Sequence, residues 1–164
     1  MDTKNIARIG MMVAVAFVLS YIESMLPLNF GVPGIKAGFS NIVVIFALFS
    51  FSPVTTFGIA VVRIILCGIT FGSLSGMLYS LAGGILSFLV MLVLKKTQKF
   101  SIYGISVAGG VFHNIGQIFV AMAVLQSSLL LYYLPFLVLA GIIAGAVVGI
   151  IGAILVKRLR HTDI

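Results

Sequence analysis

The stretch that decides the fold is FSNIVVIFALFSFSPVTTFGIAVVRIILCGITF, residues 39–71, which is almost entirely apolar. A single helix of this length would run ~50 Å at ~1.5 Å per residue, whereas the hydrocarbon core of a bilayer is ~30 Å thick. The sequence SFSP at 50–53 interrupts the stretch, because Pro53 lacks a backbone donor and disfavours a helical conformation at the preceding residue. We therefore predict two helices, at 39–52 and 54–71, joined by a tight turn.

The rest of the chain has the same apolar character. Of its 164 residues, 62% are hydrophobic and 8% are charged. A soluble domain of this size needs many more polar residues to cover its surface. The long apolar runs, separated by short Gly, Pro or Lys/Arg segments, are typical of an integral membrane protein. We predict one all-α transmembrane domain over residues 1–164, a bundle of six helices at about 6–26, 39–52, 54–71, 74–94, 102–126 and 134–156.

The basic residues test the number of spans. With six helices, eight of the ten basic residues fall on one side of the membrane: Lys4, Arg8, Lys95, Lys96, Lys99, Lys157, Arg158 and Arg160. With five helices, the group at 95–99 would lie opposite Lys4 and Arg8. Because basic residues favour the cytoplasmic side, we predict six spans with both termini in the cytoplasm. The net charge of +7 then follows from topology, and a nucleic-acid partner is not needed to explain it.

The other polar residues concentrate between the membrane midplane and the outside. Arg63, for example, lies nine residues into its helix, ~13 Å from the inner boundary, where a charge costs ~2.5–3.5 kcal/mol. His113 and Gln117 share one helix face, and Asn114 adjoins them. We infer a polar cavity that opens outward and captures an external solute. Its predicted substrate-binding residues are Glu23, Lys36, Asn41, Arg63, Tyr79, His113, Asn114 and Gln117.

Each of these residues also has a structural interpretation that the sequence leaves open. Glu23 could be solvated at the membrane surface or paired with Lys36. Arg63 could extend outward to water or satisfy carbonyls between helices. The His and amide side chains of the helix at 102–126 could form hydrogen bonds between helices. Asn41 could cap its own helix, and Tyr79 could belong to the outer aromatic belt.

The segment PLNFGVPGIKAG, residues 27–38, is too short and too rich in Pro and Gly to cross the membrane. We predict a structured external loop after the first helix, with Lys36 able to point at a bound anion. The alternative is an ordinary connector.

Small residues recur at four-residue spacing in two helices, which lets another helix approach closely. They are Gly141, Gly145 and Gly149 in the helix at 134–156, and Gly10 with Ala14 and Ala16 with Ser20 in the helix at 6–26. The sequence leaves open whether they serve internal packing or a partner membrane protein.

Four blocks of the sequence carry a family resemblance. They are SYIESMLPLNFGVPGIKAGFSNIVVIFAL at 20–48, YSLAGGILSFLVM at 79–91, SVAGGVFHNIGQIFVA at 106–121 and YYLPFLVLAGIIAG at 132–145. They resemble the Gx transporter family, also named heptaprenyl diphosphate synthase component I. This family is similar to the S-components of energy-coupling factor (ECF) transporters, six-helix membrane proteins that capture vitamins or metal ions.

The resemblance implies a multi-pass protein of the bacterial cytoplasmic membrane whose partners are a transmembrane T-component and separate ATPases. It also implies that the loop at 27–38 caps the site. Gly10, Ala14, Ala16 and Ser20 would then face the T-component, although Gly10 and Ser20 replace alanines of the usual Ala-x-x-x-Ala pattern.

The residues themselves argue against enzyme chemistry. Prenyl diphosphate synthesis needs clustered aspartates to hold magnesium, but this chain has only Asp2 and Asp163, one near each end. His113 and His161 lie at different depths and no Cys/His cluster exists, so we predict no metal site and no cofactor. Cys67 is the only cysteine, which excludes an intramolecular disulfide.

Two classes of function remain. The first is a substrate-capturing subunit of an ECF-like importer. With Glu23 the only acid of its pocket, that subunit would bind a small anionic or electron-rich solute. The second is an accessory membrane subunit of isoprenoid or quinone metabolism, which would bind a lipid diphosphate or recruit a soluble synthase. A stand-alone carrier is a third possibility.

Overall fold

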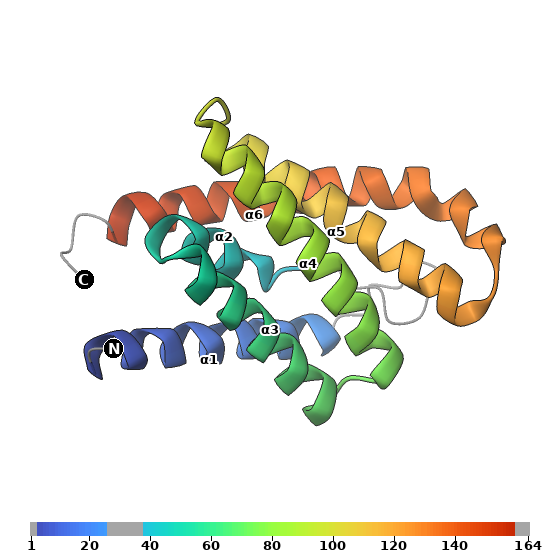
Figure 1. Cartoon of the computed structure of the whole chain (residues 1–164), viewed down its shortest axis with the longest axis horizontal. Coiled ribbons are helices and arrows are strands. Elements are labelled where there is room, and N and C mark those ends of the chain that lie inside the picture. Colours follow the sequence, from blue (N-terminus) through green and yellow to red (C-terminus); the bar gives the residue numbers. More distant parts are fainter. Residues whose placement is uncertain (1–2, 26–37, 160–164) are drawn as a thin grey trace.

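The computed structural model describes residues 3–25 and 38–159, and this part of the chain is helical, without a strand (Figure 1). Its elements are α1 (Thr3–Met25), α2 (Asn41–Ser50), α3 (Pro53–Thr70), α4 (Leu74–Thr97), α5 (Ile102–Leu125), the 3-10 helix η1 (Ser128–Tyr133) and α6 (Leu134–Leu159). By length and composition, five segments of the described chain can cross a membrane, with η1 and α6 counted as one segment. The all-helical prediction is confirmed, and the protein is a multi-pass membrane protein.

The second helix is shorter than predicted. The sequence indicated a helix at 39–52, but α2 has ten residues and is ~15 Å long, about half the thickness of the hydrocarbon core. Gly38, with φ +85°, begins the turn that leads into α2, and the extended backbone of Phe51 ends it. The six predicted helices are all present in the described chain, but α2 is too short to span the membrane alone.

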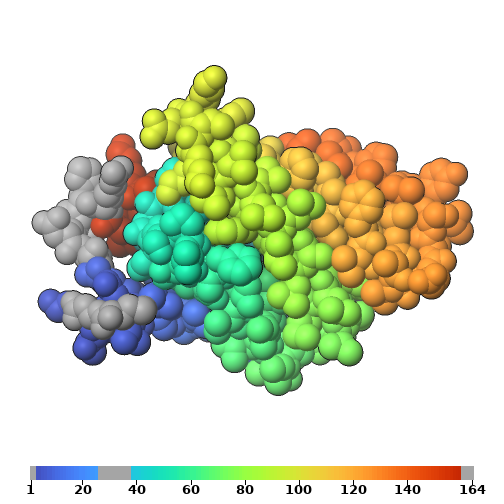
Figure 2. All heavy atoms as spheres, viewed as in Figure 1, coloured from blue at the N-terminus to red at the C-terminus, as the bar shows by residue number. Residues whose placement is uncertain are grey.

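Instead of facing lipid over a full span, α2 forms the centre of the bundle. Six of its ten residues are buried, and α3 and α4 hide most of it on the face seen in Figure 2. One core cluster joins it to four other helices: Val44, Ile45 and Leu48 of α2, Ala60 of α3, Phe88 and Met91 of α4, Ile105 of α5 and Val148 of α6. The helix that carries Asn41 is therefore fixed from several sides.

The break between α2 and α3 occurs where the sequence predicts it. Ser52 is extended and occupies the N-cap of α3, where its hydroxyl accepts a hydrogen bond from the Thr55 N–H at 3.2 Å. Pro53 follows as the first helical residue, a position that needs no backbone donor. Capping and proline geometry together separate the two helices.

The glycines of α6 serve internal packing. At the crossing of α5 and α6, a Cβ on Gly110 would lie 2.3 Å from the Gly141 carbonyl oxygen, so the two backbones are in direct contact. One turn away, the Ser106 hydroxyl of α5 donates to the Gly145 carbonyl at 2.8 Å. Of the two interpretations of this stripe, the structure supports internal packing.

The first residues of α1 and the last residues of α6 lie at the same end of the bundle (Figure 1). Arg8 and Leu159 line a shared groove of about 400 Å³ at this end. The C-terminus of α2 also reaches it, where Lys95 Nζ donates to the Leu48 carbonyl and lies 5.1 Å from the centroid of the Phe49 ring. Arg8, Lys95 and the basic last turn of α6 thus lie at one end of the bundle, as the six-helix prediction requires. That this end faces the cytoplasm stays a prediction.

Small residues of α1 divide between two faces. Gly10 and Ala14 are exposed, whereas Ala16 and Ser20 are buried. Ala16 packs in a core cluster with Val43 of α2 and other apolar residues. Ala16 and Ser20 therefore cannot form part of an exposed docking face in this structure, and only Gly10 and Ala14 remain available to a partner.

Candidate functional site

Arg63 of α3 lies inside the bundle with 7% of its surface exposed. Its Nη1 donates to the Ser20 hydroxyl of α1 at 3.2 Å and to the hydroxyl of Ser40, just before α2. The interpretation in which Arg63 extends outward to water is therefore wrong. Its Nε has no hydrogen-bond partner within residues 3–25 and 38–159. Nη1 therefore links α3 to α1 and to the residue before α2, whereas the Nε–H is unpaired among the described residues.

Glu23, near the end of α1, is also buried, at 5% exposure. Its Oε1 accepts a hydrogen bond from the Gly38 backbone N–H, where the described chain resumes before α2. The carboxylate also interacts electrostatically with Arg63. The interpretation of Glu23 as solvated at the membrane surface is wrong. Glu23 therefore holds the entry to α2 and places a negative charge near the buried arginine.

The His and two amide residues that the sequence singled out in α5 face the interior, as their spacing predicts. Asn114 Nδ2 donates to the Leu137 carbonyl of α6 at 2.7 Å, so part of the proposed interhelical bonding is real. Asn114 Oδ1, His113 Nδ1 and both amide atoms of Gln117 have no partner among the described residues. Gln117 is fully buried.

These α5 side chains adjoin the Arg63 region. His113 interacts electrostatically with Arg63, and a Cβ on Gly38 would lie 3.9 Å from His113 Cδ2. On the other side, a Cβ on Gly83 of α4 would lie 2.9 Å from Gln117 Cγ, so glycine lets α4 close over the amide. We call this set the polar cluster: Ser20, Glu23, Ser40, Arg63, His113, Asn114 and Gln117.

Buried polar atoms without partners are uncommon in folded proteins, and each costs about 1–3 kcal/mol. In the described chain, five such side-chain atoms occur, and all five belong to the polar cluster: Arg63 Nε, His113 Nδ1, Asn114 Oδ1, Gln117 Nε2 and Gln117 Oε1. Because all five atoms belong to it, the polar cluster is the candidate binding site.

Two described site residues, Asn41 and Tyr79, are not among the residues that define the polar cluster. Asn41 is the first residue of α2, and Ser40 occupies the cap position without a side-chain capping bond, so the interpretation of Asn41 as an N-cap is wrong. Tyr79 is 2% exposed and packs in an apolar cluster with Ile118, which excludes the aromatic belt. Lys36 lies outside the described residues, as does most of the loop at 27–38 that was predicted to cover the site.

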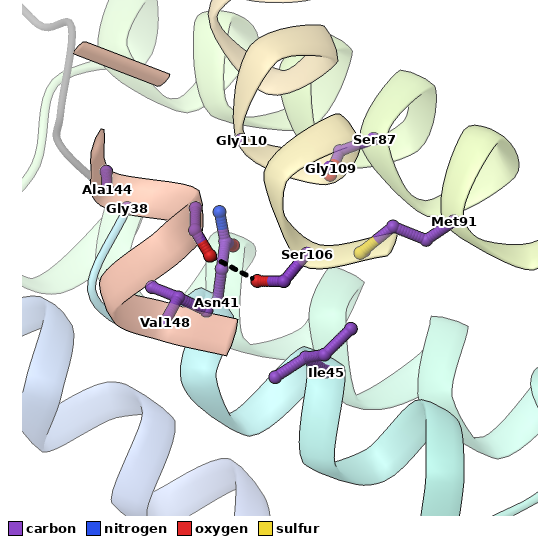
Figure 3. A pocket seen from close by; sticks show the side chains of 11 residues that line it. Gly38, Asn41, Ile45, Ser87, Met91, Ser106, Gly109, Gly110, Ala144 and Val148 are labelled. Carbon is purple, nitrogen blue, oxygen red and sulfur yellow. Dashed lines mark hydrogen bonds between the residues drawn. The ribbon is translucent and has the colours of Figure 1, made fainter. Parts of the chain in front are cut away.

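A small cavity adjoins the polar cluster between α2, α4, α5 and α6 (Figure 3). Its volume is ≈10 Å³, about the space that one water molecule needs. It is lined by Gly38, Asn41, Ile45, Ser87, Met91, Ser106, Gly109, Gly110, Ala144, Gly145 and Val148. Asn41 is the one predicted site residue in this lining, so the outward-opening pocket that the sequence predicts stays a prediction.

Sequence reasoning missed the serines of this region. Ser40 binds Arg63, Ser106 binds the α6 backbone, and Ser87 lines the cavity. Ser20 was assigned to partner docking but binds Arg63. Serine is common on all surfaces of membrane helices, and only the position of Ser40 beside Asn41 in the sequence could have indicated a role.

The fold has a solved counterpart. The chain is similar to the S component of a bacterial ECF transporter, with a TM-score of 0.72 and 25% sequence identity over 99% of this chain and 98% of the other. The bundle therefore has the fold of an ECF-transporter S component, a class of membrane-embedded substrate-binding subunits.

The family model for heptaprenyl diphosphate synthase component I matches residues 12–155, and the chain belongs to this family. No curated protein matches the chain.

Proposed function

We propose that this protein is the substrate-binding subunit of an ECF-type importer in the bacterial cytoplasmic membrane. It captures a small anionic or electron-rich solute from outside the cell. The observation that carries this proposal is the polar cluster, where five buried polar atoms lack partners in the described chain. The similarity to an S component of an ECF transporter supports it.

The charge of the site supports an anionic or electron-rich ligand. Arg63 is the one buried residue among the described lysines and arginines, and Glu23 already accepts a bond from Gly38. The free Nε–H of Arg63 is a donor that a carboxylate or phosphate oxygen accepts well. Lys36, outside the described residues, would add a second positive charge in this proposal.

Import against a gradient needs an energy source that the sequence does not contain, since it has no G-x-x-x-x-G-K-[ST] loop. A T-component and ATPases would supply it. The exposed pair Gly10 and Ala14 on α1 is the proposed contact with the T-component, because small residues let a partner helix approach closely.

Ligand binding to the Arg63→Met variant tests the proposal. A panel of anionic vitamins and cofactors is titrated against wild type and variant in detergent, and Lys96→Met, which removes an exposed charge at the other end, is the control. Loss of a charge-assisted hydrogen bond costs about 1.5–3 kcal/mol, which corresponds to about a 10- to 150-fold weaker affinity. Unchanged affinity in Arg63→Met would reject the role of the arginine.

The family name favours a second candidate, an accessory subunit of isoprenoid metabolism that binds a lipid diphosphate or recruits a soluble synthase. Among the described residues, no group of three His, Cys, Asp or Glu side chains could hold a metal ion. Affinity purification from the native membrane separates the two candidates. A T-component and ATPases are the expected partners, whereas a soluble prenyltransferase in their place would support the second candidate.

A further inference from the structure

The amide of Asn114 has a fixed orientation. Its Nδ2 donates to the Leu137 carbonyl at 2.7 Å, and reversing the amide would place two oxygens against each other. Its Oδ1 is therefore the atom left without a partner among the described residues. A carbonyl oxygen accepts hydrogen bonds and cannot donate them. Whatever satisfies Asn114 must carry an N–H or O–H group.

Gln117, one helical turn further along α5, presents a complete amide edge. The residue is fully buried, and neither Oε1 nor Nε2 has a partner in the described chain. An amide edge is satisfied best by a molecule that offers a donor and an acceptor side by side. The unpaired Arg63 Nε–H is a further donor of the polar cluster, and an acceptor such as a carboxylate oxygen would satisfy it.

From this inventory we propose the chemical class of the ligand, an inference that rests on the function proposed above. The ligand is a small cyclic amide, imide or amino-substituted heterocycle that carries a carboxylate or similar anionic group. Its N–H edge binds Asn114 Oδ1 and the Gln117 amide, and its anionic group faces Arg63. Inorganic anions and lipid diphosphates offer acceptors almost exclusively, so they leave the two amide oxygens unsatisfied.

Two consequences follow for the Gln117→Met variant, in which a side chain of similar length replaces the amide. Without ligand, the variant should be at least as thermostable as wild type, because it removes two buried polar atoms that lack partners. With ligand, it should bind about 10-fold or more weakly. Gln117→Leu serves as a second variant, and Gln126→Ala removes an exposed amide at the end of the same helix as the control.

The probes are small cyclic amides and imides with a carboxylate, headed by orotate, each paired with its N-methylated counterpart such as 1,3-dimethylorotate. Inorganic pyrophosphate and farnesyl diphosphate complete the panel. Binding is measured as the shift in Tm and by titration calorimetry. We expect an N–H compound to stabilise wild type and Gln126→Ala, with its N-methylated pair and both phosphates ineffective.

The inference is overturned if no N–H compound binds, or if an N-methylated or phosphate probe binds as tightly as its N–H counterpart. A lower Tm of ligand-free Gln117→Met and Gln117→Leu would overturn it too, because it would mean that the amide is already satisfied in the empty protein. These failures differ from failure of the proposed function, which is judged by co-purification with a T-component and ATPases.

Discussion

Substituting Gly145 by alanine should separate α6 from α5. A Cβ at this position would lie 2.7 Å from the Ser106 carbonyl oxygen and 2.7 Å from Val107 Cα, and neither backbone atom can turn away. Overpacking of this kind costs about 1–3 kcal/mol. Weakening the bond from the Ser106 hydroxyl to the Gly145 carbonyl costs about 1 kcal/mol more, which the higher helix propensity of alanine roughly offsets.

The expected net destabilisation of Gly145→Ala is therefore about 1–3 kcal/mol, or a fall in Tm of about 2–12 °C for a chain of this size. Gly58→Ala is the matched control, because a Cβ there meets no described atom within 4 Å and only helix propensity changes. The assay is a fluorogenic thiol dye, since Cys67 is the only cysteine and is buried. If Gly145→Ala melts at or above the temperature of Gly58→Ala, the close packing of α5 on α6 is refuted.

Three further substitutions test other contacts by the same thiol assay. Lys95→Met loses the bond to the Leu48 carbonyl and should lower Tm by about 2–6 °C, whereas exposed Lys96→Met should not. Ser52→Ala removes the N-cap of α3, worth about 1 kcal/mol, and an unchanged Tm would mean that the proline alone sets the helix start. Glu23→Gln removes the charge from the side chain that accepts from the Gly38 N–H and attracts the buried Arg63. It should destabilise by about 1.5–3 kcal/mol, and an unchanged Tm would contradict this role.

Helix positions could be predicted from the sequence because hydrophobic length and proline act locally. The break at Ser52–Pro53 depends on the geometry of two residues, and both ends of α3 agree with prediction to one residue. The short span of α2 could not be predicted, because periodicity does not distinguish an apolar helix that crosses the membrane from one buried at the centre of a bundle. The packing of four other helices around α2 decides that it lies at the centre of the bundle.

Part of the site could be predicted for a similar reason. His113 and Gln117 lie four residues apart on one helix, so their common direction follows from the chain itself. The partners of Arg63 on α1 and before α2 depend on how three helices meet, and no spacing rule encodes that. For Tyr79, the aromatic-belt interpretation was wrong. The aromatic-belt rule considers depth in the membrane and ignores which side of the helix faces the core.

Single side chains of the polar cluster both stabilise the bundle and carry a polar atom without a partner in the described chain. Arg63 uses Nη1 to join α1 to the start of α2, while its Nε has no partner in the described chain. Asn114 divides its amide in the same way between the α6 backbone and an unpaired oxygen. Under the proposed function, a ligand would engage both residues without breaking the bonds that hold the bundle. Gln117 has no such structural bond among the described residues, so substitutions there separate binding from folding most cleanly.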